Sequence, residues 1–251
     1  MKGKISGIIL TGILSFGFSF AQTNEELYSK GIQFKKDLNY KEGIAVFQRL
    51  LKSDSSKADY LQNASFFYSR YGRTLPENLR MNYYNIGEYL ARKSIRANNT
   101  DAECHYAYAL ALGRINENAS SKQKIANAKL IKSELDLVLK INPKHAGAWH
   151  ILGRWHRTIA GFGVIEKLAI NTLYGGVPPG GSFEDAVKAF TNAIIIEPKY
   201  KLHQTELAYT YFEMGKKADA KVWLQKAMAL PEVSIDDVIA TAKLKELEKK
   251  F

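Results

Sequence analysis

The sequence predicts an all-α protein built from consecutive helical hairpins. Apolar and small residues recur at helical spacing from about residue 24 to the end, and the 251 residues include only 6 Pro. A hydrophobic content of 46% argues against disorder. Because the helical pattern repeats along the chain, each hairpin needs to pack only on its neighbours, and we expect a repeat array rather than one globular core.

The segment from Pro143 to Pro198 shows the repeat unit most clearly. Trp149, Leu152 and Gly153 share one helical face, and the glycine lets a second helix approach closely. The second helix carries the small and aromatic residues Ala186, Phe190 and Ala193. These are the two helices of a tetratricopeptide (TPR) unit. We therefore predict a TPR-like right-handed superhelix of helical hairpins with a C-terminal capping helix.

Residues 1–21 have the composition of a cleavable secretory signal. Lys2 and Lys4 precede an apolar run, and the small residues Ser19 and Ala21 stand at the −3 and −1 positions of a cleavage site. The apolar run is shorter than the roughly 20 residues that a membrane-spanning helix requires. We predict cleavage after Ala21 and export to the periplasm or secretion, with an uncleaved membrane anchor as the alternative.

The remaining residues, 22–251, are predicted to form one helical repeat domain. First helices of successive hairpins are expected near Asn24, Ala58, Ala102, Ala146 and Lys201, which lie 34, 44, 44 and 55 residues apart. These lags equal one TPR period of about 34 residues with growing insertions. The hairpins then cover about 24–54, 58–98, 102–142, 146–198 and 201–231. Ser234 and Asp237 open a last helix over 235–251, which we expect to cover the apolar face of the last hairpin.

The fourth hairpin contains an insert at 157–182. An extra helix is predicted over about 163–174, with an apolar stripe formed by Val164, Ile165, Leu168, Ala169 and Leu173. Gly175 suits the position after a helix end, and the prolines at 178 and 179 prevent the helix from continuing. The insert is expected to be either a lid over a groove or a packing brace.

Several segments occur in the order and spacing of a known family. They are Leu152 to Trp155, Ile165 to Lys167, Phe183 to Ala186, Gly215 to Trp223 and Leu230 to Val233. Over roughly residues 89–251 the chain resembles the regulator of microtubule dynamics family. The resemblance implies a TPR-like, non-enzymatic adaptor, associated in the family with microtubules and, in some members, with organelle membranes through an N-terminal hydrophobic segment. A secretory signal departs from that setting, because export removes the protein from any microtubule.

The first helices of a TPR array line its concave groove, with their fifth and ninth residues pointing inward. Counting from the predicted starts, and adding the residue one turn past Arg154, gives the partner-binding candidates Tyr28, Phe66, Tyr106, His150, Arg154, Arg157 and Tyr209. A guanidinium can donate two hydrogen bonds to one carboxylate, so this groove is predicted to bind a peptide with an acidic group. The alternative is that Arg154 and Arg157 pair internally with acids such as Glu166 and orient the insert.

Composition narrows the functional classes further. The net charge of +11, or +9 without Lys2 and Lys4, is consistent with an acidic partner or with a lysine-coated surface. Basic residues are scattered rather than interleaved with aromatics in a strip, which disfavours nucleic acid as a partner.

Cys104 is the only cysteine, and the five His show no metal-ligand spacing, so we predict neither a metal nor a cofactor. Trp149 is expected in the packing core.

We therefore expect a non-enzymatic, exported scaffold that binds a protein or peptide of acidic character in its concave groove. Two alternatives stay open: a membrane-tethered organiser that keeps its N-terminal segment, and a microtubule-associated adaptor as the resemblance implies. A hydrolase that uses Cys104 or His150 is a third hypothesis, but no catalytic partner for either residue can be placed.

Overall fold

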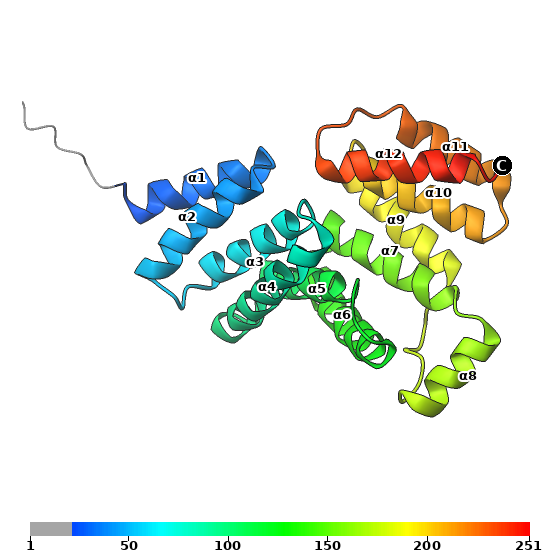
Figure 1. The fold of residues 1–251 in the computed structure, drawn as a ribbon, viewed down its shortest axis with the longest axis horizontal. Coiled ribbons are helices and arrows are strands. Elements are labelled where there is room, and N and C mark those ends of the chain that lie inside the picture. The colour runs from blue at the N-terminus through cyan, green and yellow to red at the C-terminus, as the bar shows by residue number, and fades with distance from the viewer. Residues whose placement is uncertain (1–21) are drawn as a thin grey trace, which may run out of the picture.

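A computed structural model describes residues 22–251, which form twelve α-helices and contain no strand (Figure 1). The predicted signal segment, 1–21, lies outside the described residues. The first helices of the hairpins are α1 (Asn24–Lys36), α3 (Ala58–Gly72), α5 (Ala102–Ile115), α7 (Ala146–Ala160) and α10 (Lys201–Glu213). Their partners are α2 (Tyr40–Ser53), α4 (Glu77–Ala97), α6 (Ser121–Ile141), α9 (Phe183–Ile196) and α11 (Lys217–Met228). The insert helix is α8 (Val164–Leu173), and the last helix is α12 (Ile235–Glu248).

Local sequence signals explain where several helices begin and end. The hydroxyl of Thr23 accepts from the backbone N–H of Glu26 and completes a capping box at α1. Ser120, Ser182 and Ser234 accept in the same way at α6, α9 and α12. After α8, Gly175 has φ +74°, a left-handed conformation that glycine adopts without strain and that ends the helix.

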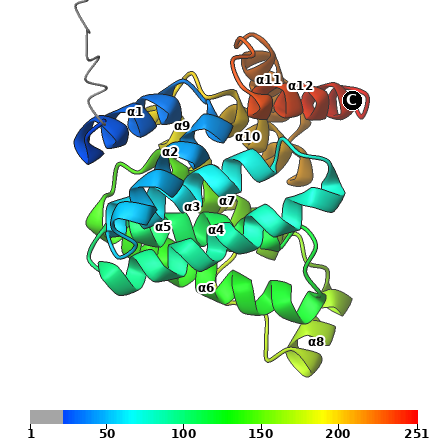
Figure 2. The same ribbon diagram turned by 60° about the vertical axis from the view of Figure 1, so that its left-hand side comes forward.

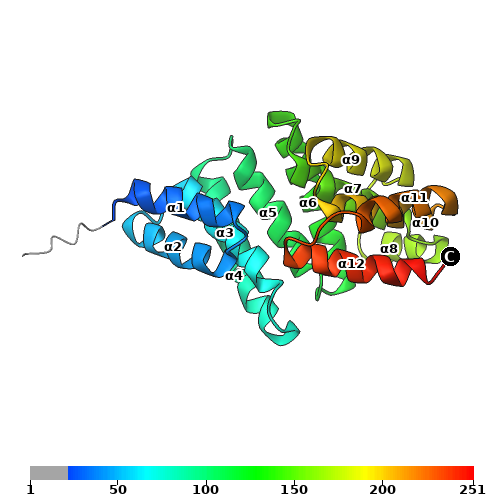
Figure 3. The ribbon, with the colours of Figure 1, turned by 90° about the horizontal axis from the view of Figure 1, so that it is seen from above.

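The hairpins stack into a superhelix, and the helices wind around a common axis in the two rotated views (Figures 2 and 3). First helices pack on one another, α3 on α5 and α5 on α7, and each first helix packs on the partner helix of its own hairpin. The predicted all-α, TPR-like superhelix is confirmed.

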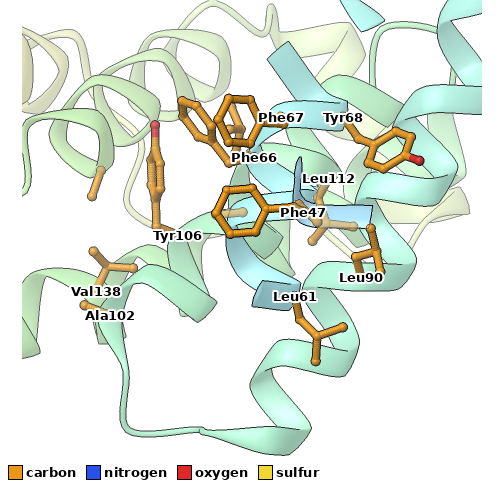
Figure 4. Packing of buried hydrophobic residues seen from close by; sticks show 14 of the residues in the cluster. Phe47, Leu61, Phe66, Phe67, Tyr68, Leu90, Ala102, Tyr106, Leu112 and Val138 are labelled. Atoms are coloured by element: carbon orange, nitrogen blue, oxygen red, sulfur yellow. The ribbon is translucent and has the colours of Figure 1, made fainter. Parts of the chain in front are cut away.

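Close packing of aromatic rings on small residues forms the main core. Phe47 and Phe67 are fully buried with ring centroids 5.5 Å apart, and Figure 4 shows them beside Phe66. In the fourth hairpin, a Cβ on Gly153 would lie 2.7 Å from the ring of Phe190, so this helix pair requires glycine. Trp149 is only half-buried against this core and donates its indole N–H to the carbonyl of Pro143 at 2.8 Å.

The last helix packs on the last hairpin. Leu244 and Leu247 of α12 are fully buried against Leu224 and Ala227 of α11. Tyr209 of α10 donates its hydroxyl to the carbonyl of Lys243 at 2.9 Å. The apolar end of α10 and α11 is therefore covered by α12.

The insert helix projects away from the hairpins (Figure 1). Its apolar stripe is exposed to solvent, with Val164 at 85%, Ile165 at 83% and Leu168 at 67% exposure, while Ile170, outside the predicted stripe, is the residue of α8 that is buried. The sequence left open whether this stripe covers a groove or packs on the hairpins, and the structure shows it facing solvent. In this structure α8 is neither a lid on the groove nor a brace that packs through its stripe.

Among the described helices, none combines the length and the apolar character needed to cross a lipid bilayer.

Candidate binding cavity

A cavity of about 710 Å³ runs along the inner faces of α3, α5, α7 and α10. Each of the first three helices contributes residues spaced one turn apart. They are Phe66 and Arg70 from α3, Tyr106, Leu110 and Arg114 from α5, and His150, Arg154 and Thr158 from α7. His203 of α10 and Glu197 and Tyr200, between α9 and α10, close one side.

The structure brings four of the seven predicted binding residues together in this cavity: Phe66, Tyr106, His150 and Arg154. The other three lie elsewhere. Tyr28 is half-buried against Phe47 and Tyr60, with both ring centroids 5.9 Å from its own. It therefore belongs to the packing of the first two hairpins.

Arg157 contacts α10 and Tyr209 contacts α12, and neither residue lines the cavity. The guanidinium of Arg157 lies 2.7 Å from the buried carboxylate of Glu206 and 3.6 Å from that of Glu213, and it covers the ring of Tyr209. Arg157 does pair internally, but the expected partner was wrong, because Glu166 accepts instead from the backbone N–H of Gly163 and caps its own helix.

The sequence analysis missed two arginines that line the cavity, Arg70 and Arg114. Arg70 and Arg114 each lie one turn beyond a ninth-position residue, Phe66 and Leu110, and Thr158 stands in the same relation to Arg154. Extending the count by one helical turn would have found all three. His203 had no such signal, since it is the third residue of its helix.

Two of the arginines are held by one carboxylate. Arg70 and Arg73, at the end of α3, both bind Asp236 in the first turn of α12, and the hydroxyl of Tyr200 donates to the same carboxylate at 2.9 Å. Burial alone would raise the pKa of Asp236, but the two guanidinium groups outweigh it and hold that pKa below its ordinary value. Asp236 is therefore ionised and neutralises one of the two arginine charges.

Other cavity cations also have acidic neighbours. Arg114 lies 3.3 Å from Glu117, and Lys35 lies 3.7 Å from Glu103, which also approaches His145 at 3.2 Å. The contact with His145 is the main cause that lowers the pKa of Glu103. The positive charges of Arg114 and Lys35 are thus partly neutralised.

A pair of histidines forms one wall. The Nδ1 atoms of His150 and His203 lie 2.9 Å apart, and Nε2 of His203 lies 3.3 Å from the carboxylate of Glu197. Burial, and then the neighbouring His203, lower the pKa of His150 well below its ordinary value. His150 is accordingly neutral near pH 7.

Positive charge exceeds negative charge around the cavity. Its lining contains seven Lys or Arg residues and two Glu. Arg154 lines this surface, is exposed, and forms no ion pair with any residue of 22–251. An anionic group entering the cavity would therefore meet an available guanidinium beside the aromatic side chains of Phe66 and Tyr106.

The cavity offers little for metal chemistry. Within the described part of the chain, no three His, Cys, Asp or Glu side chains are grouped closely enough to hold a metal ion. Cys104 is fully buried, and burial raises the pKa of its thiol to about 11. The arrangement is suited to binding an anionic, partly apolar ligand.

Comparison with known proteins gives one consistent result. A family model described as regulator of microtubule dynamics protein 1-3 matches residues 24–251. Regulator of microtubule dynamics protein 3 of Bos taurus is 28% identical over 207 residues, which are 80% of this chain and 44% of that protein. Regulator of microtubule dynamics protein 1 of Homo sapiens is 29% identical over 178 residues, 70% of this chain and 56% of that protein. The chain thus spans about half the length of the curated relatives it matches.

Among solved structures, a thermophilic TPR protein from Thermus thermophilus superposes with a TM-score of 0.62. The match covers 88% of this chain and 99% of that chain at 16% sequence identity. At this identity the likeness supports the TPR fold alone.

Proposed function

The chain belongs to the regulator of microtubule dynamics family, as the match over residues 24–251 shows, and from that premise we propose that it is a non-enzymatic adaptor whose cavity binds an acidic segment of a protein partner. The resemblance found in the sequence is thereby confirmed for the family. Stacked TPR hairpins create extended concave surfaces of the kind that bind peptides.

The observation that carries the proposal is the state of Arg154. Every other arginine of the cavity lies against an acidic residue, whereas Arg154 projects into it with no ion pair among the described residues. Its guanidinium can donate two hydrogen bonds to one carboxylate, and the rings of Phe66 and Tyr106 supply apolar contact nearby. An acidic side chain flanked by apolar residues fits this combination.

The test is the affinity for an acidic probe. A fluorescein-labelled hexaglutamate peptide is titrated against the wild type and Arg154→Glu in about 0.1 M salt. Loss of a charge-assisted hydrogen bond, with a repulsive charge in its place, should weaken binding by roughly tenfold or more. Circular dichroism checks that helicity is unchanged, as expected for an exposed side chain.

Arg49→Glu is the matched control. Arg49 is exposed on α2 and lies outside the cavity, and the substitution changes the net charge by the same amount. It should change the affinity less than twofold, because screening weakens charges separated by more than about 10 Å. An equal loss in both variants would mean that the peptide senses only the overall positive charge, and would refute a groove site.

We propose in addition that residues 1–21 direct export and are removed after Ala21, so that the adaptor works outside the cytoplasm. The support is the basic start, the apolar run and the small residues before the expected cut. The competing function is that of a microtubule-associated or membrane-tethered adaptor, favoured by the names of the relatives. N-terminal sequencing after fractionation of the native host separates these two functions. A mature protein that starts at Gln22 outside the cytoplasm supports export. A retained Met1 on a protein that faces the cytoplasm supports the microtubule-associated or membrane-tethered adaptor.

A further inference from the structure

The contact between His150 and His203 restricts where protons can reside. Two Nδ1 atoms 2.9 Å apart must share one hydrogen, since two lone pairs would repel and two N–H groups would clash. Both rings are buried, with 8% and 1% exposure, so water does not relieve this constraint. One histidine therefore donates and the other accepts.

Glu197 decides which histidine accepts when both are neutral. Its carboxylate only accepts hydrogen bonds, so Nε2 of His203 carries a hydrogen and donates to it. This bond lowers the pKa of Glu197 and keeps it ionised. The Nδ1 of neutral His203 is then the acceptor, and His150 donates from Nδ1. The Nε2 of His150 is left as a bare acceptor with no hydrogen-bond partner in residues 22–251.

One added proton reverses this arrangement. The proton binds Nε2 of His150, and the hydrogen shared between the two Nδ1 atoms moves from His150 to His203. The pair then carries one positive charge, with one N–H directed at Glu197 and another N–H on Nε2 of His150. The wall beside Arg154 thereby changes from a hydrogen-bond acceptor into a donor.

Several charged groups around His150 disfavour the binding of this proton. Arg154 on α7 and Arg70 on α3 repel it, and burial adds to the cost. Glu206 on α10 and Glu197 before it act in the opposite direction, and Tyr106, Tyr200 and His145 also face this space. A carboxylate bound beside Arg154 would shift the balance, because it gains a second donor when His150 carries the hydrogen at Nε2.

We propose that the cavity binds the carboxylate of its partner together with one proton, which enters the His150–His203 pair. The inference rests on the proposed function of this cavity and adds a pH dependence to it. Affinity for an acidic segment rises as the pH falls, by up to about tenfold per pH unit where one full proton is taken up. Partner capture is thus favoured in mildly acidic surroundings.

The experiment measures this linkage with the same labelled hexaglutamate, acetylated and amidated so that only side-chain carboxylates are present. Affinity is followed from pH 8 to pH 5.5, where glutamate side chains with a pKa of about 4.3 remain ionised. Calorimetry in two buffers of different ionisation enthalpy counts the protons taken up. The wild type should bind more tightly at lower pH and take up close to one proton.

Variants identify the group that titrates. The double variant His150→Gln/His203→Gln keeps side chains that can donate or accept but cannot gain a proton, so its affinity should not vary with pH and its binding heat should not vary with buffer. His145→Asn removes the other cavity histidine, retains a helix cap in place of the His145 bond to the N–H of Ala148, and should leave the linkage intact. If the double variant does not fold, Glu197→Gln, at a half-exposed carboxylate, should shift the pH midpoint of tightening downward.

The outcomes separate this inference from the adaptor proposal. Binding that requires Arg154 but shows no pH dependence or proton uptake overturns the histidine relay and leaves the adaptor function in place. Linkage that disappears in His145→Asn and persists in His150→Gln/His203→Gln also overturns it. Absence of binding by the wild type at every pH overturns both proposals.

Discussion

Arg70, near the end of α3, forms an ion pair with Asp236, in the first turn of α12, although 166 residues separate them in the chain. Arg73 binds the same carboxylate, and Tyr200 donates to it at 2.9 Å. The pair ties the last helix to the second hairpin and closes the inner side of the superhelix. It also holds Arg70 in place on the cavity wall.

This closure should be measurable as stability. Asp236→Ala leaves two largely buried guanidinium groups without their carboxylate, and removing one partner of a buried ion pair costs about 3–5 kcal/mol. Urea denaturation should show this loss in the free energy of unfolding. Asp136→Ala is the control, because its exposed pair with Lys132 contributes less than about 0.5 kcal/mol. Equal, small losses in both variants would contradict a stabilising role for Asp236.

Acid should weaken the contact between α7, α10 and α12. Burial would raise the pKa of Glu206, but Arg157, Arg154 and Lys243 outweigh it and hold the pKa well below the ordinary value. Because the folded-state pKa lies below the unfolded one, the stabilisation is present above about pH 4.3 and is lost as the pH falls below it.

Denaturation at several values between pH 7 and pH 3 tests this expectation. The free energy of unfolding of the wild type should decrease more steeply with acid than that of Glu206→Gln, which starts lower because its amide cannot replace the charge. Parallel curves would show that Glu206 does not contribute to the acid sensitivity.

Gly153 should not tolerate a side chain. A Cβ there would meet the ring of Phe190 at 2.7 Å, so Gly153→Ala should lower the free energy of unfolding by about 1–3 kcal/mol through overpacking. Gly113→Ala, in a helix with open space at the Cβ position, should instead stabilise by up to about 1 kcal/mol. Thermal unfolding of both variants measures the difference, and a destabilised Gly113→Ala would indicate that helix propensity does not govern that site.

The thiol of Cys104 should be unreactive in the folded protein. Its thiol is fully buried and its pKa is raised to about 11 by burial, so little thiolate exists at pH 8 and reagents have no access. Ellman's reagent should detect one thiol in denaturant and almost none within minutes under native conditions. Rapid native labelling would reopen the possibility of a nucleophilic role.

The two faces of α8 should respond differently to charge. Ile165 is 83% exposed and Ile170 is 8% exposed. Ile165→Lys should leave the melting temperature almost unchanged, whereas Ile170→Lys buries an unpaired ammonium and should lower it by several degrees. A large effect of Ile165→Lys would mean that its side chain is covered in solution.

The helix starts, their repeat spacing and the inward residues of each first helix could be predicted because these features are local. Caps, glycines and prolines act within a turn or two, and residues one turn apart share a face wherever the helix is placed. Phe66, Tyr106, His150 and Arg154 were therefore found from spacing alone. Tyr28 and Tyr209 obeyed the same spacing but lie where a neighbouring hairpin or α12 covers them, which the spacing does not reveal.

By itself the sequence determined the type of repeat, the number of hairpins and the periodicity that points a set of side chains inward. Only the tertiary structure decided which of those side chains remain free. The curvature of the superhelix brings Asp236 to Arg70, His203 to His150 and Glu206 to Arg157, and it leaves Arg154 without an ion pair in the described chain. Such pairings depend on the summed rotation between successive hairpins, and no local pattern in the chain encodes that sum.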